Sequence, residues 1–287
     1  MANQIGGKAV VAAMNTTVAE QVAHLKQQGC NPTLAILRVG DRPDAVSYQA
    51  GATKRNEQLG ITVNSVVLPQ NAMQDAVLQV VDELNRNPSV HGVLMLRPFP
   101  SHMDDRAVRE ALAPEKDVDG ITNASLYGVF TGVQTGFPPC TAEGCLHIFD
   151  HYQIPLLGRR AVVVGASLVI GRPVAMMLLM RGATVTICHI DTVDLPAECR
   201  RGEVLVVAAG KRGLIGADCL SPGQVILDVG VNVGEDGKLY GDVDFAAADK
   251  VVQAISPVPG GVGAVTTSVL ASHVVQAAQR ALCHKNG

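Results

Sequence analysis

The chain has 287 residues, a hydrophobic content of 47% and a formal net charge of −3 at pH 7. These values describe a globular protein long enough for about two domains. The absence of a basic excess argues against nucleic acid as a partner, and no apolar run approaches the roughly 18 residues of a membrane helix. The first residues lack the pattern of a signal peptide, and the seven cysteines contain no C-x-x-C pair. We therefore expect a cytoplasmic protein with reduced thiols and no metal site.

The first half of the chain alternates helix and strand patterns. A helical periodicity over 16–28 precedes a predicted strand at 33–39, and Asp44 is the predicted N-cap of a helix that runs to about Leu59. Strand 61–68, helix 73–85, strand 90–96 and a short helix at 104–112 follow. This βαβαβα order predicts a parallel sheet covered by helices, with ligands beyond the carboxyl ends of its strands.

Three side chains are candidates for a site at that edge. Tyr48 follows the first predicted strand, Arg97 follows the third, and Asp119 lies in the segment Lys-Asp-Val-Asp-Gly at 116–120. Each residue also has an ordinary structural interpretation. Tyr48 fits a core aromatic, Arg97 a solvated charge, and Asp119 a turn residue beside a glycine.

The second half begins with a predicted helix at 142–152 that leads into another domain. The β-branched run before Gly165 predicts a buried parallel strand, and Pro173 suits the first turn of the helix that follows. A strand, a glycine turn and a helix start point backbone N–H groups at an anionic phosphate. Gly165 and Gly171 occupy the first and last glycine positions of a dinucleotide fingerprint, while Ser167 stands near the missing middle glycine. Any strand–helix junction remains the alternative.

Further elements continue this pattern to the end of the chain. The sequence predicts helix 172–181, strand 183–189, helix 195–200, strand 204–209, strand 224–229, a hairpin at 235–238, a glycine-rich loop at 260–263 and a last helix at 265–284. The second strand ends at His189, Ile190 and Asp191, about 20 residues after the glycine turn, where such folds meet the adenosine ribose. Asp191 would accept hydrogen bonds from the ribose hydroxyls and repel a 2′-phosphate, which favours NAD over NADP. Its alternative role is a helix N-cap.

Several motifs occur together in order along nearly the whole chain. They are Val39-Gly-Asp-Arg-Pro43 with Tyr48, Pro98-x-Pro100, Lys116-Asp-Val-Asp-Gly120, Pro139-Cys-Thr141, Val163-Val-Gly-Ala-Ser167, Gly171-Arg-Pro173, Asp228-Val-Gly-Val-Asn232, Gly241-Asp-Val243 and Pro257-Val-Pro-Gly-Gly-Val-Gly263. With these motifs the sequence resembles the methylenetetrahydrofolate dehydrogenase/methenyltetrahydrofolate cyclohydrolase family.

The resemblance implies an α/β fold of two domains with a cleft between them. A parallel-sheet substrate domain over 1–140 is joined by the C-terminal helix 266–287, and a Rossmann-type dinucleotide-binding domain covers 141–265. A tetrahydrofolate derivative is the implied substrate, and the implied assembly is a homodimer. The resemblance makes Tyr48 and Asp119 the catalytic residues, and gives the folate contacts Tyr48, Leu96, Arg97, Pro98, Asp119, Pro259, Gly260 and Gly261. The implied cofactor contacts are Gly165, Ala166, Ser167, Gly171, Arg172, Pro173, His189, Ile190, Asp191, Ala209, Gly210 and Val231.

The sequence departs from the family pattern where the cyclohydrolase needs its polar groups. The family places a Lys four residues after the Tyr, and this position is Ala52. Lys54 matches a second family Lys, about 200° further around the helix. Leu96 stands at the family's Gln, and is followed by Arg97 where the family has an apolar residue. Ala166 and Ile190 occupy positions where NADP-binding members offer cationic or hydroxyl groups.

The departures affect the two family reactions differently. Loss of hydride is driven by the substrate's own nitrogen lone pair, whereas hydrolysis of the methenyl cation requires a group of tuned pKa such as a desolvated Lys. The sequence therefore predicts an NAD-dependent methylenetetrahydrofolate dehydrogenase with absent or weak cyclohydrolase activity. The alternatives are a fully bifunctional enzyme, a cleft refitted to another substrate, and a folate- or nucleotide-binding protein without turnover.

Overall fold

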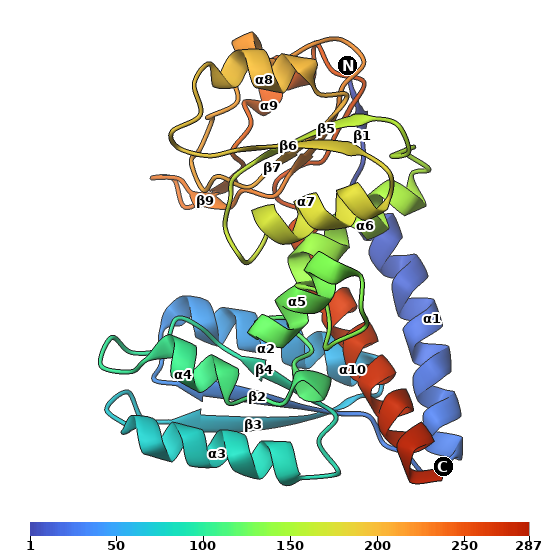
Figure 1. Ribbon diagram of the computed structural model, residues 1–287, viewed down its shortest axis with the longest axis vertical. Coiled ribbons are helices and arrows are strands. Elements are labelled where there is room, and N and C mark those ends of the chain that lie inside the picture. Colours follow the sequence, from blue (N-terminus) through green and yellow to red (C-terminus); the bar gives the residue numbers. More distant parts are fainter. Residues whose placement is uncertain (287) are drawn as a thin grey trace. The chain divides into compact units, whose positions relative to one another are not determined.

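The computed structural model describes residues 1–286, with side chains through Cys283, and comprises two compact units. One unit consists of Ala13–Cys140 and the chain from Thr267 on, and contains a three-stranded sheet; the other consists of Met1–Ala12 and Thr141–Thr266, and contains a six-stranded sheet. We call them the three-stranded and the six-stranded unit (Figure 1). Gly287, the last residue of the predicted C-terminal helix, lies outside the described residues.

The first twelve residues differ from the predicted division. They belong to the six-stranded unit, because β1 (Asn3–Gln4) pairs in parallel with β11 (Ala254–Ile255). The backbone N–H of Ala2 also donates to the carbonyl of Asp249, at 2.8 Å. A two-residue strand has no periodicity to detect, so only its pairing reveals it.

The three-stranded unit confirms the predicted parallel βαβαβα pattern. Strands β2 (Thr33–Val39), β3 (Thr62–Leu68) and β4 (Gly92–Met95) lie in the order β3-β2-β4. The helices are α1 (Gly7–Gln27), α2 (Pro43–Gln58), α3 (Gln74–Arg86), α4 (Asp105–Glu110), α5 (Asn123–Thr131) and α10 (Val262–Asn286). The first six residues of α1 lie in the other unit, and α10 enters this unit at Thr267. All of β2 is buried, as expected for a central strand with helices on both faces.

Two local predictions in this unit are wrong. Helix α1 begins at Gly7 rather than at 16, and α5 was not predicted. Asp44 is not the N-cap of α2, because that position is Arg42, and Asp44 lies in the first helical turn, where its carboxylate pairs with the Arg42 guanidinium. Pro43 at the start of the helix moves the N-cap two residues earlier, from Asp44 to Arg42.

The six-stranded unit is a doubly wound sheet. Its order is β1-β11-β8-β7-β5-β6, with parallel pairing between all neighbours. The remaining strands are β5 (Arg160–Val164), β6 (Thr184–Cys188), β7 (Val204–Val207) and β8 (Val225–Asp228), and β9 (Asn232–Val233) with β10 (Leu239–Tyr240) forms the predicted hairpin. The unit is completed by the helices α6 (Cys140–His151), which enters it at Thr141, α7 (Gly171–Met180), α8 (Leu195–Arg201) and α9 (Phe245–Ala248). In Figure 1, α7 covers one face of the sheet and α8 the other.

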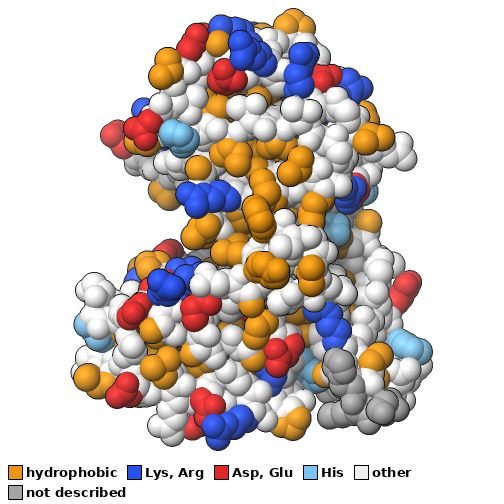
Figure 2. Space-filling model, viewed as in Figure 1, with side chains coloured by type: hydrophobic (Ala, Val, Ile, Leu, Met, Phe, Trp, Pro, Cys, Tyr) orange, Lys and Arg blue, Asp and Glu red, His pale blue; other side chains and the backbone are white. Residues whose placement is uncertain are grey.

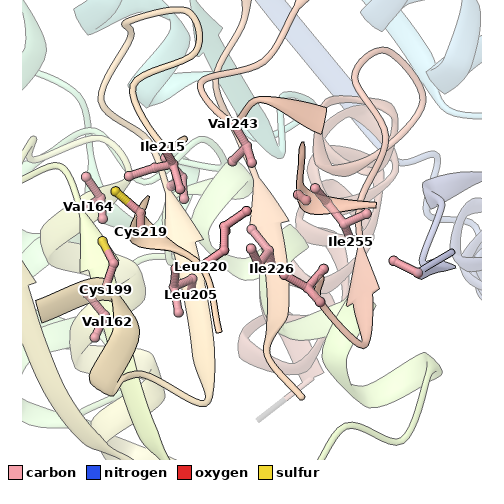
Figure 3. Packing of buried hydrophobic residues seen from close by; sticks show 14 of the residues in the cluster. Val162, Val164, Cys199, Leu205, Ile215, Cys219, Leu220, Ile226, Val243 and Ile255 are labelled. Atoms are coloured by element: carbon pink, nitrogen blue, oxygen red, sulfur yellow. The ribbon is translucent and has the colours of Figure 1, made fainter. Parts of the chain in front are cut away.

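The core of the six-stranded unit gathers one face of four strands. Figure 3 shows Val162, Leu205, Ile226 and Ile255, which come from neighbouring strands and belong to the same buried cluster as Cys199 and Cys219. No disulfide joins any of the seven cysteines, all of which lie in the described part of the chain. This packing fixes the strand ends that carry the predicted cofactor residues.

The surface carries both signs of charge. Basic and acidic side chains are interspersed on the face shown in Figure 2, in keeping with the small net charge of the chain. No helix among the described residues is both long and apolar enough to cross a membrane.

Candidate active site

The predicted phosphate turn lies where the strand order of the sheet reverses. The chain leaves β5 for β6 on one side and then returns to β7 on the other side of β5. Gly165, directly after β5, has φ of +121°, and a Cβ there would lie 2.2 Å from the Ala208 carbonyl oxygen. A Cβ on Gly171 would lie 2.0 Å from the Gly165 carbonyl oxygen. Both positions require glycine, whereas the side chain of Ser167 is accommodated and accepts a hydrogen bond from Ile170 N–H at 3.2 Å.

The turn offers donors to an anion. Within the described residues, the backbone N–H groups of Ala166, Ser167, Leu168 and Val169 have no acceptor in the protein. They precede α7, in which Arg172 is exposed and Pro173 is buried. Free N–H groups together with the positive end of a helix dipole suit a pyrophosphate. The residues present therefore fit the diphosphate of a dinucleotide.

The end of β6 presents an acidic side chain to solvent. Asp191 N–H donates to His189 Nδ1 at 3.2 Å, which leaves the ring proton on Nε2. The Asp191 side chain is 85% exposed, and its carboxylate lies 3.7 Å from His189 Nδ1. Ile190 between them is 98% exposed. The geometry leaves the carboxylate oxygens accessible to hydroxyl donors.

Asp242 holds the loop after β7, a role that sequence reasoning missed. Its carboxylate is fully buried and accepts hydrogen bonds from Ala209 N–H at 2.7 Å and Gly210 N–H at 2.8 Å. It also accepts one from Asn232 Nδ2 at 2.9 Å, next to Val231, whose side chain is 60% exposed. One carboxylate thus fixes two predicted cofactor contacts, Ala209 and Gly210, and the residue that follows a third, Val231. Asp242 lies more than 30 positions after Ala209 and Gly210, so the sequence does not reveal these hydrogen bonds. The acidic residue between Gly241 and Val243 was the one sequence signal that pointed to a buried carboxylate here.

A second buried carboxylate supports the first. Asp228 is 4% exposed and accepts hydrogen bonds from the N–H groups of Gly230, Asp242 and Val243. Burial raises the pKa of Asp228 to about 6, and these three hydrogen bonds oppose the shift, while the charge of Asp242 adds to it. The two carboxylates tie the end of β8 to the hairpin that follows.

Helix α2 carries Ala52, the residue that the sequence predicts to stand at the position of the family Lys. Ala52 is fully buried, one helical turn after Tyr48. Tyr48 is 36% exposed, but its hydroxyl end is desolvated, which raises the pKa of Tyr48 well above its usual value, with the charge of Asp119 and the Cys140 thiol adding to the effect. The pair Tyr48 and Asp119, predicted from positions far apart in the sequence, therefore lies within electrostatic reach.

The lysines of the three-stranded unit lie elsewhere. Lys54 is exposed and lines an open groove of about 580 Å³ with Arg38, Gln49 and Ser65, on another face of α2. The Lys116 ammonium donates to the carbonyls of Leu84 and Asn87, at 2.7 Å each, and the Lys26 ammonium lies next to Gly60. Among the described side chains of this unit, no lysine amine stands beside Tyr48 and Asp119.

The loop after β4 is held by arginine contacts. Leu96 is 7% exposed, and the Arg97 guanidinium binds both carboxylate oxygens of Asp105, with 2.7 Å from Nε to Oδ1. Pro98 is exposed, and its carbonyl accepts from Arg42 at 2.8 Å. Arg97 is thus already engaged by a carboxylate, and this pairing lowers the pKa of Asp105.

Asp119 is a half-buried carboxylate in a tightly held loop. Burial and the neighbouring charge of Asp117 raise the pKa of Asp119 to about 7, while a hydrogen bond from Cys140 and the charges of His273 and Arg97 act in the opposite direction. A carboxylate that titrates near neutrality, beside a desolvated phenol, can accept hydrogen bonds from paired N–H donors when ionised.

Pro259, Gly260 and Gly261 belong to the six-stranded unit, not to the unit of Tyr48 and Asp119. The carbonyl of Gly260 accepts from Gly7 N–H at 2.8 Å. Their assignment to the folate stays a prediction, as do the other residue roles given above.

Comparison with known proteins decides the family. Residues 5–119 match the description "Tetrahydrofolate dehydrogenase/cyclohydrolase, catalytic domain", and residues 139–282 match the NAD(P)-binding domain of the same family. The chain belongs to the tetrahydrofolate dehydrogenase/cyclohydrolase family. The resemblance inferred from the motifs is confirmed, and with it the α/β fold of two domains.

Individual relatives agree with the family assignment. The chain is 46% identical over 280 residues to "Bifunctional protein FolD" of Bordetella avium and 44% identical over 281 residues to that of Carboxydothermus hydrogenoformans. Each alignment covers 97% of this chain and 98% of the relative. The crystal structure of the bifunctional dehydrogenase/cyclohydrolase FolD from Campylobacter jejuni superposes with a TM-score of 0.95 at 38% identity, covering 98% of this chain and 99% of that one.

Proposed function

We propose that this family member is an NAD-preferring 5,10-methylenetetrahydrofolate dehydrogenase whose methenyltetrahydrofolate cyclohydrolase activity is weak or absent. The observation that carries the proposal is the α2 face itself. Ala52 is buried one turn after Tyr48, and Lys54 is exposed on another face of the helix. A helix cannot present both positions to one site, because two residues correspond to about 200° of rotation.

The dehydrogenase reaction tolerates these replacements. A lone pair on a folate nitrogen expels the hydride, so the substrate becomes a methenyl cation without any proton transfer to the protein. NAD, when bound, supplies the hydride acceptor. The chain's own task is to bind and orient: ionised Asp119 would accept hydrogen bonds from the pterin N–H and amino groups, and Tyr48 would pack against the folate body. A carboxylate near the folate also favours the positive charge that develops on it.

The cyclohydrolase reaction does not tolerate them. Water must be activated and protons moved between ring nitrogens, which requires a general acid–base group. Neither Ala52 nor Leu96 can transfer a proton, and the Arg97 guanidinium is already engaged by the Asp105 carboxylate. The expected loss of general acid–base assistance is typically about 10²–10⁴-fold in rate.

The preference for NAD rests on the end of β6. The Asp191 carboxylate is exposed and would accept hydrogen bonds from the ribose hydroxyls, whereas a 2′-phosphate there would meet a like charge. The neighbouring positions Ala166 and Ile190 supply no cation or hydroxyl.

Two assays test the proposal. Initial rates of methylenetetrahydrofolate oxidation with NAD and NADP at equal concentration should show NADH forming faster. Methenyltetrahydrofolate supplied directly should hydrolyse at close to the buffer rate, at least about 100-fold more slowly than with a bifunctional relative. A hydrolysis rate like that of the relative would contradict the proposal and identify a fully bifunctional enzyme. If neither NAD nor NADP is reduced, the proposed dehydrogenase activity is refuted. Cofactor binding without reduction would then favour a binding protein without turnover, and absence of cofactor binding would favour a cleft refitted to another substrate.

We propose a homodimer on the family resemblance. Sedimentation equilibrium should give twice the 30.0 kDa chain mass, and a monomer at micromolar concentration would contradict it.

A further inference from the structure

Two buried side chains converge on one backbone carbonyl directly before Asp119. The carbonyl oxygen of Val118 lies 2.8 Å from His273 Nδ1 and 3.2 Å from Cys140 Sγ. Both side chains are 1% exposed. His273 lies on α10, 155 residues along the chain from Val118, and Cys140 begins α6. Sequence reasoning assigned no function to either residue.

The chemistry of the carbonyl fixes the protonation of the imidazole. A carbonyl oxygen can only accept, so His273 Nδ1 must carry the proton that it shares with Val118. The contact of 3.6 Å between Cys140 Sγ and His273 Nδ1 then cannot be a hydrogen bond donated by the thiol to that nitrogen. The single Cys140 S–H donates to the Val118 carbonyl at 3.2 Å, and the same thiol is near enough to Asp119 to lower the pKa of that carboxyl.

The rest of the loop is fixed independently. The buried Asp117 carboxylate accepts hydrogen bonds from Ile121 N–H, Thr122 N–H and Ser125 Oγ, at 3.0, 2.8 and 2.6 Å. Gly120 has φ of +71°, and a Cβ there would lie 2.5 Å from the backbone of Pro138. The segment 117–120 is therefore held on both sides of Asp119. The Val118 carbonyl sets the orientation of the peptide plane from which Asp119 projects.

We propose that His273 and Cys140 are positioning residues for substrate binding: by donating together to the Val118 carbonyl, they orient Asp119 to accept the paired N–H donors of the pterin ring. The inference rests on the proposed function and adds two residues to it. An aspartate side chain can accept two parallel N–H donors only if its plane is aligned with them, so rotation of the preceding peptide would weaken binding of the folate. Binding of the dinucleotide, whose predicted contacts lie in the six-stranded unit, should not respond.

Matched pairs of variants separate positioning from packing. His273→Asn retains a donor near the position of Nδ1, whereas His273→Leu has none. Cys140→Ser retains a hydroxyl donor, whereas Cys140→Ala has none. Each donor-free variant should raise the folate KM about 2- to 13-fold, the factor expected for one hydrogen bond, with smaller changes in kcat and in the NAD KM. The donor-retaining partner of each pair should restore most of the folate KM.

The outcomes are distinct. Equal folate KM values within each pair would overturn the proposal, as would parallel losses in folate KM, NAD KM and thermal stability, which indicate a packing role. If His273→Leu does not fold, the Cys140 pair, which differs by one oxygen atom, decides. Asp119→Asn in the same assay separates the proposed function from the positioning role. If the folate KM of Asp119→Asn is unchanged, the proposed role of Asp119 is refuted. If it rises while the folate KM of the donor-free variants is unchanged, only the positioning role of His273 and Cys140 is refuted.

Discussion

The pH dependence of folate binding follows from the environment of Asp119. Burial and the charge of Asp117 raise the pKa of Asp119 to about 7 in the ligand-free protein. Only the ionised form accepts two N–H donors, because the protonated carboxyl offers a donor in place of one acceptor. Acidification below neutral pH should therefore weaken folate binding, while alkaline solutions should have little further effect.

The magnitude follows from the ionised fraction. With a pKa of about 7, Asp119 is about 90% ionised at pH 8, about 10% at pH 6 and about 1% at pH 5. The affinity for tetrahydrofolate and the kcat/KM for methylenetetrahydrofolate should each fall roughly 10-fold between pH 8 and pH 6, and about 10-fold again by pH 5. A pKa nearer the usual value for Asp, about 3.9, would leave both quantities unchanged across this range.

Equilibrium dialysis of tetrahydrofolate at several pH values provides the direct measurement, with kcat/KM as the companion series. Asp119→Asn serves as the control, with weaker binding and no acid limb. Arg97→Leu removes a positive charge that lowers the pKa of Asp119, so its acid limb should move to higher pH. A flat affinity profile from pH 8 to 5, or an acid limb that persists in Asp119→Asn, would refute the reasoning.

Three further predictions concern the six-stranded unit. Asp191→Ser removes the carboxylate that would repel a 2′-phosphate and should raise the kcat/KM ratio of NADP to NAD by about 10-fold, or 1.4 kcal/mol, in paired initial rates; an unchanged ratio would contradict the assigned role. Asp242→Asn weakens charge-assisted hydrogen bonds to Ala209 and Gly210 and should raise the NAD KM about 10-fold or more with little effect on the folate KM; equal effects on both would count against loop positioning. Burial raises the pKa of Asp228 to about 6. Between about pH 4 and 6 the native state therefore binds more protons than the unfolded state, so the contribution of this group to the unfolding free energy falls as the pH rises through that window. Relative to the native protein, Asp228→Asn should gain about 2 kcal/mol of unfolding free energy between pH 4 and pH 7 in urea titrations, and a pH-independent difference would contradict the assignment.

Local sequence signals located much of the candidate site. The run of valines before Gly165 predicted β5 and its turn, because a buried parallel strand and a glycine at φ of +121° both leave marks in adjacent residues. Helical periodicity alone separated Lys54 from Ala52, and the structure shows the first exposed and the second buried. The N-cap at Asp44 was wrong because a neighbouring proline competed with it for the helix start.

The sequence by itself determined the alternation of strands and helices, the glycine turn and the presence of Ala52, not a lysine, one helical turn after Tyr48, since each depends on residues within a few positions of one another. Tertiary structure decided the strand order that brings β5 beside β7, and the membership of the first twelve residues. It also decided that Asp242 holds the loop at Ala209 and that His273 reaches Val118. A hydrogen bond between residues 33 or 155 positions apart leaves no periodic pattern in either segment, because its partner is selected by packing and not by chain neighbours.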